Sequence, residues 1–207
     1  MTQAAKRPPG RARSDASRLA ILNSTLSLLE SQSLQQISIE AIAREAGVGK
    51  ATIYRWWPSK AAVVIDAFVS THVSRVTAAK GKGPRDSLEQ ILRLLVKEYA
   101  GREGRIVAQL IAEGQSDPEV LREFAERFWS GRRAMALELV NEARRLGELR
   151  DDIPAEFQLD QIFSPVYFRL LFGQAPLDKA FADAHWESIM RLMAPAARRT
   201  PTAPKSR

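Results

Sequence analysis

The chain has 207 residues, a formal net charge of +7 and no cysteine. This length allows one large domain or two small ones, either with a sizeable hydrophobic core. A chain without cysteine forms no disulfide and no thiolate metal site, which fits a cytoplasmic protein. No apolar run reaches the length of a membrane span, so we expect no membrane partner, and the first residues lack the apolar core of a secretory signal.

The positive charge is concentrated at the two ends of the chain. Residues 1–60 carry nine Lys or Arg against four Asp or Glu, and residues 194–207 add four Lys or Arg and no acid. Residues 61–193 carry 18 basic and 20 acidic side chains. A generally basic surface would spread the charge evenly. The asymmetry therefore favours a polyanion bound at the N-terminal end.

The two termini have the composition of disordered segments. Residues 1–14 combine basic side chains with Pro8, Pro9 and Gly10, which predicts a disordered basic arm. Two roles are open for this arm: it reaches phosphates or a minor groove beside a DNA-reading helix, or it is a solvated tail. Residues 195–207 are also rich in proline and basic residues, and we predict a second disordered tail there.

Three helices are predicted between the arm and residue 58. Leucines recur at helical spacing over residues 15–32 and predict an amphipathic first helix. Ser38 is a suitable N-cap for a second, short helix, and Gly47 stands where a left-handed C-cap is needed. A third helix is predicted over residues 50–57. Two short helices joined by a tight turn with glycine form the helix-turn-helix pattern, which the first helix would complete as a three-helix core.

The rest of the chain also has the pattern of helices. Pro58-Ser59-Lys60 begins the next helix without a linker. A rotation of that helix would therefore move the three-helix unit at 15–58, which we call the reading head, as a rigid body. Further helices are predicted to about residue 80 and over residues 84–101, 105–113, 118–146, 155–173 and 178–193. Gly104 and Gly114 bound the helix at 105–113, and Asp117-Pro118 is a strong start signal for the helix at 118–146. No segment has the two-residue period of a strand. We predict an all-α protein of about nine helices, with a helix-turn-helix domain at 15–58 and a larger helical bundle at 59–194.

The predicted third helix has no acidic residue and is rich in groups that donate to DNA. Lys50 and Arg55 have the reach to donate to guanine O6 and N7, and Ala51 suits contact with a thymine methyl group. Trp56 is equally suited to a sugar-phosphate contact and to packing. The remaining candidates suit phosphate oxygens: Ser38, Thr52, Tyr54 and Lys60.

Three motifs follow one another in this stretch: Ile39-x-x-Ile42-Ala43-x-x-Ala46-Gly47-Val48, Lys50-Ala51-Thr52-Ile53-Tyr54-Arg55 and Pro58-Ser59-Lys60. Together they resemble the DNA-binding head of the TetR (tetracycline repressor) family. Gly49 departs from the family's usual Ser or Thr, which removes one side-chain contact to DNA, and Trp57 replaces a more usual Phe. The resemblance implies a homodimeric transcriptional regulator, usually a repressor. Its last two helices, here about 155–173 and 178–193, would pair with those of a second copy.

The family resemblance also implies a small-molecule pocket between the middle helices, although the effector is unknown. Aromatic side chains at helical spacing are more often ordinary core, so both interpretations stand for the candidate lining residues: Tyr99, Gln109, Phe124, Phe128, Trp129, Phe163 and Tyr167. We expect a ligand-responsive repressor that binds palindromic operator DNA. The alternative is a DNA-binding adaptor whose larger domain binds a protein and no small molecule.

An enzyme is not expected. The chain has two histidines, which lie far apart in sequence, and it has no glycine-rich phosphate loop and no nucleophile motif. We therefore predict no catalytic residue, no metal ligand and no cofactor.

We predict that Arg55→Ala weakens DNA binding by about 1–3 kcal/mol, mostly at specific sites. A guanidinium that donates to guanine recognises a particular sequence, so its loss affects random DNA less. Competition binding with random DNA measures both affinities. An equal loss on both kinds of DNA would exclude the base contact.

Overall fold

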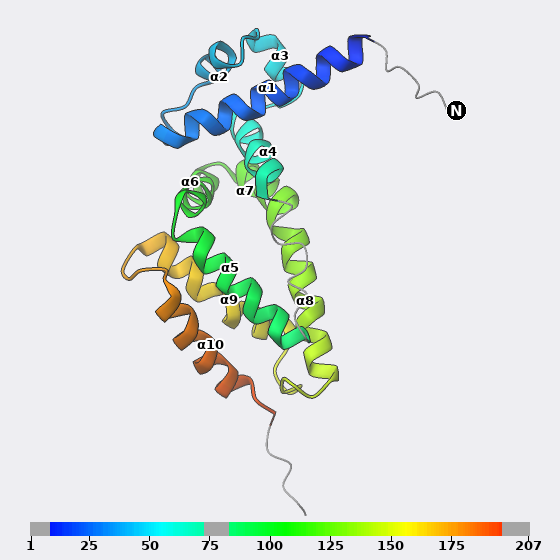
Figure 1. The fold of residues 1–207 in the computed structure, drawn as a ribbon, viewed down its shortest axis with the longest axis vertical. Coiled ribbons are helices and arrows are strands. Elements are labelled where there is room, and N and C mark those ends of the chain that lie inside the picture. The colour runs from blue at the N-terminus through cyan, green and yellow to red at the C-terminus, as the bar shows by residue number, and fades with distance from the viewer. Residues whose placement is uncertain (1–8, 73–82, 196–207) are drawn as a thin grey trace, which may run out of the picture. The chain divides into compact units, whose positions relative to one another are not determined.

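The computed structural model describes residues 9–72 and 83–195. These residues contain only helices, turns and loops, which confirms the all-α prediction. Parts of the predicted arm, fourth helix and basic tail lie outside the described residues. No helix within the described ranges is long and apolar enough to cross a membrane. The elements, drawn in Figure 1, are α1 (Pro9–Ser31), α2 (Ile39–Glu45), α3 (Lys50–Tyr54), α4 (Lys60–His72), α5 (Pro84–Tyr99), α6 (Arg102–Ser116), α7 (Pro118–Phe124), the π-helical turn η1 (Ala125–Trp129), α8 (Ser130–Arg145), α9 (Ala155–Phe172) and α10 (Lys179–Met193).

The helices α7, η1 and α8 follow one another without a break, so residues 118–145 form one continuous helix. Counted in this way, the described residues contain nine helices, the number that the sequence predicts. The start of this long helix is also as predicted. The Asp117 carboxylate accepts a hydrogen bond from the N–H of Glu119 (3.0 Å), and Pro118 occupies the first position.

The first helix is longer than predicted. It begins at Pro9 rather than at Asp15, so residues 9–14 of the predicted disordered arm are helical. Proline suits the first position of a helix because it has no N–H group to leave unpaired. The composition of the arm therefore misled the prediction of this boundary, and residues 1–8 lie outside the described part of the chain.

The helix α6 also extends beyond its predicted bounds, 105–113. Gly104 and Gly114, which the prediction placed at its ends, lie inside it. A Cβ atom on Gly104 would lie 2.2 Å from the carbonyl oxygen of Tyr99, and one on Gly114 would lie 2.8 Å from the Cβ of Leu121. The two glycines therefore mark close contacts of α6 with neighbouring chain, and not the ends of a helix.

The chain divides into two compact units, one of residues 1–77 with 98–133 and one of residues 78–97 with 134–207. In the first unit α1 packs against α2 and α4, α4 contacts α7 and η1, and α6 contacts α7 (Figure 1). The predicted domain boundary at residue 58 therefore does not coincide with the edge of a compact unit. The helices α4, α6 and α7 cluster with the predicted reading head.

The helix α4 is buried almost all round, as expected of a helix without a polar face. Asp66 is the single charged residue in its stretch 61–69. Its Oδ2 accepts hydrogen bonds from the indole N–H of Trp57 (2.9 Å) and from Arg18 of α1 (2.7 Å). Its Oδ1 lies 3.4 Å from a guanidinium nitrogen of Arg127 in η1. One carboxylate thus connects α4 to the first helix, to Trp57 in the segment between α3 and α4, and to the π-helical turn.

In the second unit α9 packs against α10. Arg93 of α5 forms an ion pair with Asp183 of α10. The N–H of Arg150, in the loop before α9, donates to the carbonyl of Met193 at the end of α10 (2.9 Å). The side-chain amide of the fully buried Gln158 donates to the carbonyl of Arg150 (2.9 Å). These contacts tie the two last helices to the loop that precedes them.

We predict that Asp66→Ala lowers the free energy of unfolding by about 1–3 kcal/mol, because it leaves the indole N–H of a buried tryptophan without its acceptor. Asp66→Asn, which keeps an acceptor but loses the charge, should cost less. Chemical denaturation measures both variants. Glu45→Ala, which removes an exposed carboxylate from α2, is the control. A loss for Asp66→Ala no larger than for the control would contradict the role of this carboxylate.

Candidate nucleic-acid interface and effector region

The helices α2 and α3 form the predicted helix-turn-helix. The Ser38 hydroxyl accepts a hydrogen bond from an N–H in the first turn of α2 (3.1 Å), which confirms the predicted N-cap. Gly47 has a φ angle of 65°, and the N–H groups of Gly47 and Val48 donate to the carbonyls of Arg44 (3.3 Å) and Ala43 (3.0 Å). This paired arrangement is the Schellman C-cap, and it fixes the turn that leads to α3.

The short helix α3 has a buried anchor and an exposed polar surface. Ile53 and Trp57 are 0% and 1% exposed and hold the segment on the core. The helix ends at Tyr54, three residues before the predicted end. Thr52 is half-buried. The other predicted contact residues of this segment are exposed: Lys50, Ala51, Tyr54, Arg55 and Trp56.

A carboxylate that the prediction did not include lies within this surface. Glu40, in the first turn of α2, forms an ion pair with Lys50 at the start of α3, with 2.9 Å between Oε1 and Nζ. The hydrogen bond from Lys50 lowers the pKa of Glu40, and the same bond raises the pKa of Lys50. Both groups therefore stay charged near neutral pH. Glu40 engages one of the three donors of Lys50, and its negative charge opposes contact of Lys50 with DNA.

Arg55 and Trp56 lie next to each other on the exposed surface. The guanidinium carbon of Arg55 is 6.0 Å from the centre of the Trp56 ring, at the outer limit of a cation–π contact. Such a contact uses the face of the guanidinium and leaves its edge, which carries the N–H donors, for other groups. Trp56 is 38% exposed and also contacts Trp57, with 6.4 Å between ring centres. Trp56 therefore packs on Trp57 and also exposes part of its ring to solvent.

Lys60 makes a contact within the protein that its predicted phosphate role did not include. It is half-buried, and its Nζ donates to the carbonyl of Leu34 in the loop between α1 and α2 (2.8 Å). The N–H of the same Leu34 donates to Oε1 of Gln109 in α6 (2.6 Å). We call these two bonds the Leu34 clamp. An ammonium group has three donors, so two remain for a phosphate.

The candidate pocket residues belong to both compact units. Tyr99, Phe124 and Phe128 are each 4% exposed and lie in the first unit. Phe124 stacks on Phe128 with 5.1 Å between ring centres, and Phe68 of α4 lies 5.0 Å from Phe128. The rings of Phe68, Phe124 and Phe128 form a packed aromatic cluster, to which the π-helical turn contributes Phe128.

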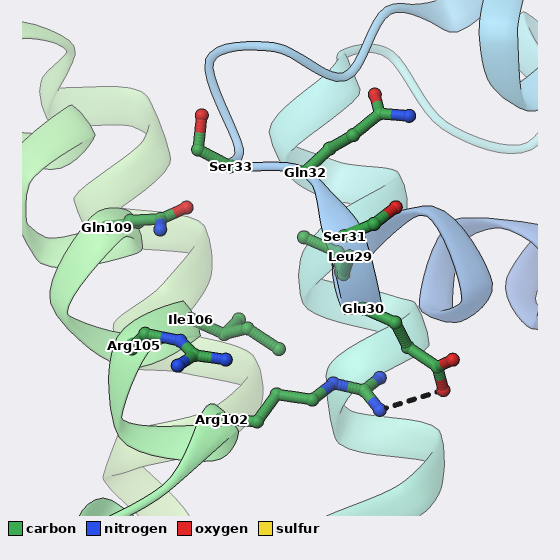
Figure 2. Close-up of a pocket in the computed structure, with 9 residues that line it drawn as sticks. All are labelled: Leu29, Glu30, Ser31, Gln32, Ser33, Arg102, Arg105, Ile106 and Gln109. Carbon is green, nitrogen blue, oxygen red and sulfur yellow. Dashed lines mark hydrogen bonds and ion pairs between the residues drawn. The ribbon is translucent and has the colours of Figure 1, made fainter.

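The other candidates are more exposed than these rings or line a different feature. Trp129 is 39% exposed, and Arg133 lies over its ring at 5.2 Å. Phe163 and Tyr167 are half-buried on α9 in the second unit. Gln109 lines a hollow of about 190 Å³ between the end of α1 and α6 (Figure 2). The residues that line this hollow are Leu29, Glu30, Ser31, Gln32, Ser33, Arg102, Arg105, Ile106 and Gln109.

Sequence reasoning missed three residues that organise this region. Asp66 could have been found from the sequence, because it is a lone charged residue within an apolar run. No sequence pattern indicated the ion pair of Glu40, since its partner Lys50 lies ten residues later on another helix. Leu34 is held through its peptide groups, which are the same in every residue apart from proline, so no sequence pattern marks it.

Comparison with known proteins gives matches along most of the chain. Residues 21–67 match the family model described as "Bacterial regulatory proteins, tetR family", and residues 82–189 match "Tetracyclin repressor-like, C-terminal domain". The chain is 35% identical over 163 residues to YdeS of Bacillus subtilis (strain 168), named as an uncharacterised HTH-type transcriptional regulator. This match covers 78% of the present chain and 82% of YdeS.

Solved structures share the fold. The crystal structure of the TetR family transcription regulator SCO0332 matches with a TM-score of 0.72 and 30% identity, over 86% of this chain and 99% of that one. FadR of Thermus thermophilus, a TetR family transcriptional repressor solved with lauroyl-CoA, matches with a TM-score of 0.65 and 22% identity. This second match covers 89% of this chain and 98% of FadR, and at its low identity it reports on the fold alone.

We predict that Glu40→Gln increases the affinity for random DNA several-fold and steepens its salt dependence by about one unit of log–log slope, because it frees Lys50 for a phosphate and removes a negative charge. Filter binding over a range of salt concentrations measures both quantities. Glu45→Gln, the same charge change at an exposed position of α2, is the matched control.

Two results would contradict this prediction. If both variants had the same effect, only the change in net charge would matter, and the pairing of Glu40 with Lys50 would have no specific role. A loss on one preferred sequence with no change on random DNA would instead indicate that Glu40 accepts a hydrogen bond from cytosine N4.

Proposed function

Because the chain belongs to the TetR family of DNA-binding transcriptional regulators, we propose that it is a repressor that binds palindromic operator DNA as a homodimer and is released by a small molecule. The observation that carries the proposal is the exposed surface of α3, where donors to bases and phosphates stand on a segment anchored by two buried side chains. Family membership supports a role in the regulation of transcription.

The surface of α3 divides into base contacts and phosphate contacts. Arg55 and Lys50 would enter the major groove, Arg55 directly and Lys50 after release from Glu40. Ala51 would contact a thymine methyl group beside them. The side chains that flank these readers would hold the phosphates on either side: Ser38, Thr52, Tyr54, Trp56 and Lys60.

The homodimer is proposed to form through α9 and α10. Phe157, Phe168, Leu171 and Phe172 of α9 are 45–71% exposed, and Leu192 of α10 is 62% exposed. Helical spacing places the four α9 residues within one stripe, because separations of 11, 14 and 15 residues return to nearly the same side of a helix. An apolar stripe of this kind on an exposed helix is typical of a surface that another protein covers.

A second copy of the chain accounts for this stripe and for DNA recognition together. Two heads related by a two-fold axis would bind two half-sites about one helical turn, or a multiple of it, apart. The operator would then read the same on both strands. A monomer with one five-residue reading helix would contact too few bases for this.

The effector is proposed to act on the first unit through η1. The π-helical turn contains Phe128 of the aromatic cluster and Arg127, which reaches Asp66. A ligand that displaced the rings would move Arg127 and, through the Asp66 carboxylate, the anchor of α3. Single-turn π-helices often occur at functional sites. The aromatic surroundings favour an apolar ligand, and the fold relative FadR of Thermus thermophilus was solved with lauroyl-CoA.

Such a ligand acts only through its different affinities for the two arrangements of the heads. The adaptor alternative is favoured by one observation, the tight stacking of Phe124 on Phe128, since a filled aromatic cluster leaves a ligand no space without rearrangement. A thermal-shift screen separates the two functions, because an effector that binds the folded state raises the melting temperature.

We predict that the wild-type protein selects palindromic fragments from a random DNA pool and that Phe168→Asp fails to do so. The charge in the apolar stripe would prevent dimer formation, so the variant should sediment as a monomer and bind the selected DNA at least tenfold more weakly. Leu146→Asp changes an equally exposed leucine outside α9 and α10 and should behave as wild type. Selection of fragments without two-fold symmetry, or a dimeric Phe168→Asp, would contradict the proposal.

A further inference from the structure

We propose that the hollow between the end of α1 and α6 is a binding site for a small organic anion that carries a carboxylate group. It is separate from the aromatic cluster, to which the effector was assigned above. Only its consequence for DNA binding rests on the proposed function, because anion binding itself is measured on the free protein. Figure 2 shows the residues that line the hollow.

Arg105 supplies the primary contact. It is exposed on α6, and its side chain extends toward the end of α1 in Figure 2. Within the described ranges no carboxylate or carbonyl pairs with its guanidinium. Arginine presents parallel N–H donors whose spacing matches the two oxygens of a carboxylate. An anion in the hollow would therefore bind Arg105 through two parallel hydrogen bonds.

Gln109 supplies a second donor with a fixed orientation. Its Oε1 accepts the N–H of Leu34 at 2.6 Å, so the amide cannot turn over without losing this bond. The Nε2 group, which carries two N–H donors, is therefore left for a ligand. It lies one turn of α6 beyond Arg105, so both residues are on the same side of the helix.

The single acid that lines the hollow is already neutralised. Glu30 is paired with Arg102 (3.1 Å), and Arg102 also donates to the carbonyl of Leu26 in α1 (3.1 Å). Arg102 therefore offsets the charge of the Glu30 carboxylate. With two arginines and one glutamate the lining has a net charge of +1, and this charge is that of Arg105.

The size and lining of the hollow restrict the ligand. Its volume of about 190 Å³ is below the range of roughly 300–1,000 Å³ that drug-sized ligands occupy. Most of its lining residues are polar, with Leu29 and Ile106 the apolar exceptions. The site therefore suits a compact carboxylate of a few carbon atoms, and it does not suit an acyl chain.

Occupancy of the hollow would act on the reading head through the Leu34 clamp. Gln109 holds Leu34 from α6, Lys60 holds it from α4, and α2 begins five residues later at Ile39. A ligand bound to both Arg105 and Gln109 would restrain the Gln109 side chain and with it the loop before α2. It would favour whichever arrangement of the head keeps the clamp closed.

The test uses the full chain and malonate, a small dicarboxylate, with malonamide as an uncharged ligand of the same size. Calorimetric titration at constant ionic strength should give saturable binding of malonate and none of malonamide. Arg105→Gln should weaken malonate binding at least tenfold. Arg145→Gln, which removes an exposed arginine from the second unit, should leave it unchanged.

Equal binding of the two ligands, equal loss in both variants, or wild-type binding by Arg105→Gln would overturn the proposal, because each points to general attraction by a basic protein. Amide NMR tests the clamp in the same samples. Malonate should shift the Leu34 amide resonance in the wild type and not in Arg105→Gln. Binding without this shift would separate the site from the head, and it would overturn the coupling. Unchanged melting curves for the two variants exclude unfolding as the cause.

Discussion

The carboxylate of Asp66 is the contact on which the position of the reading head depends. It lies on a helix with no other charge for several residues on either side, and it accepts hydrogen bonds from Arg18 of the first helix and from Trp57, three residues beyond the end of α3. Burial of α4 fixes the carboxylate in place, and the carboxylate orients Trp57 in turn. The third partner, Arg127, belongs to a π-helical turn, a rare element that often occurs at functional sites. The contact therefore joins the buried helix α4 to the irregular part of the long helix.

Most of the fold could be predicted because the sequence patterns that mark helices and their ends depend on residues close together in the chain. Ser38, Gly47 and Asp117 define helix ends through contacts with residues at most five positions away, and the structure confirms all three. The errors arose where tertiary packing decided the outcome. The glycines of α6 looked like helix ends, but they are required by the close approach of neighbouring chain. Such an approach leaves no trace in the periodicity of the sequence.

The candidate site was less predictable, since its geometry depends on pairs that lie far apart in the chain. Exposure of Lys50, Tyr54 and Arg55 followed from the helical pattern, whereas the pairing of Lys50 with Glu40 did not. Lys60 and Gln109 were assigned to opposite functions, one to DNA and one to a ligand. The structure brings both to the same residue of the head. This shared partner connects a predicted DNA contact on α4 with a residue of α6.

The Leu34 clamp has a consequence for how the protein tolerates mutation. Both of its bonds at residue 34 are made by the backbone, so replacing the leucine side chain changes core packing and leaves the N–H and the carbonyl in place. Proline is the one residue that would remove the N–H donor. Mutations can therefore alter the Leu34 clamp chiefly at Lys60 and Gln109, whose side chains make its two bonds. Substitution of either side chain would remove one bond and leave the other bond and the backbone of the loop in place.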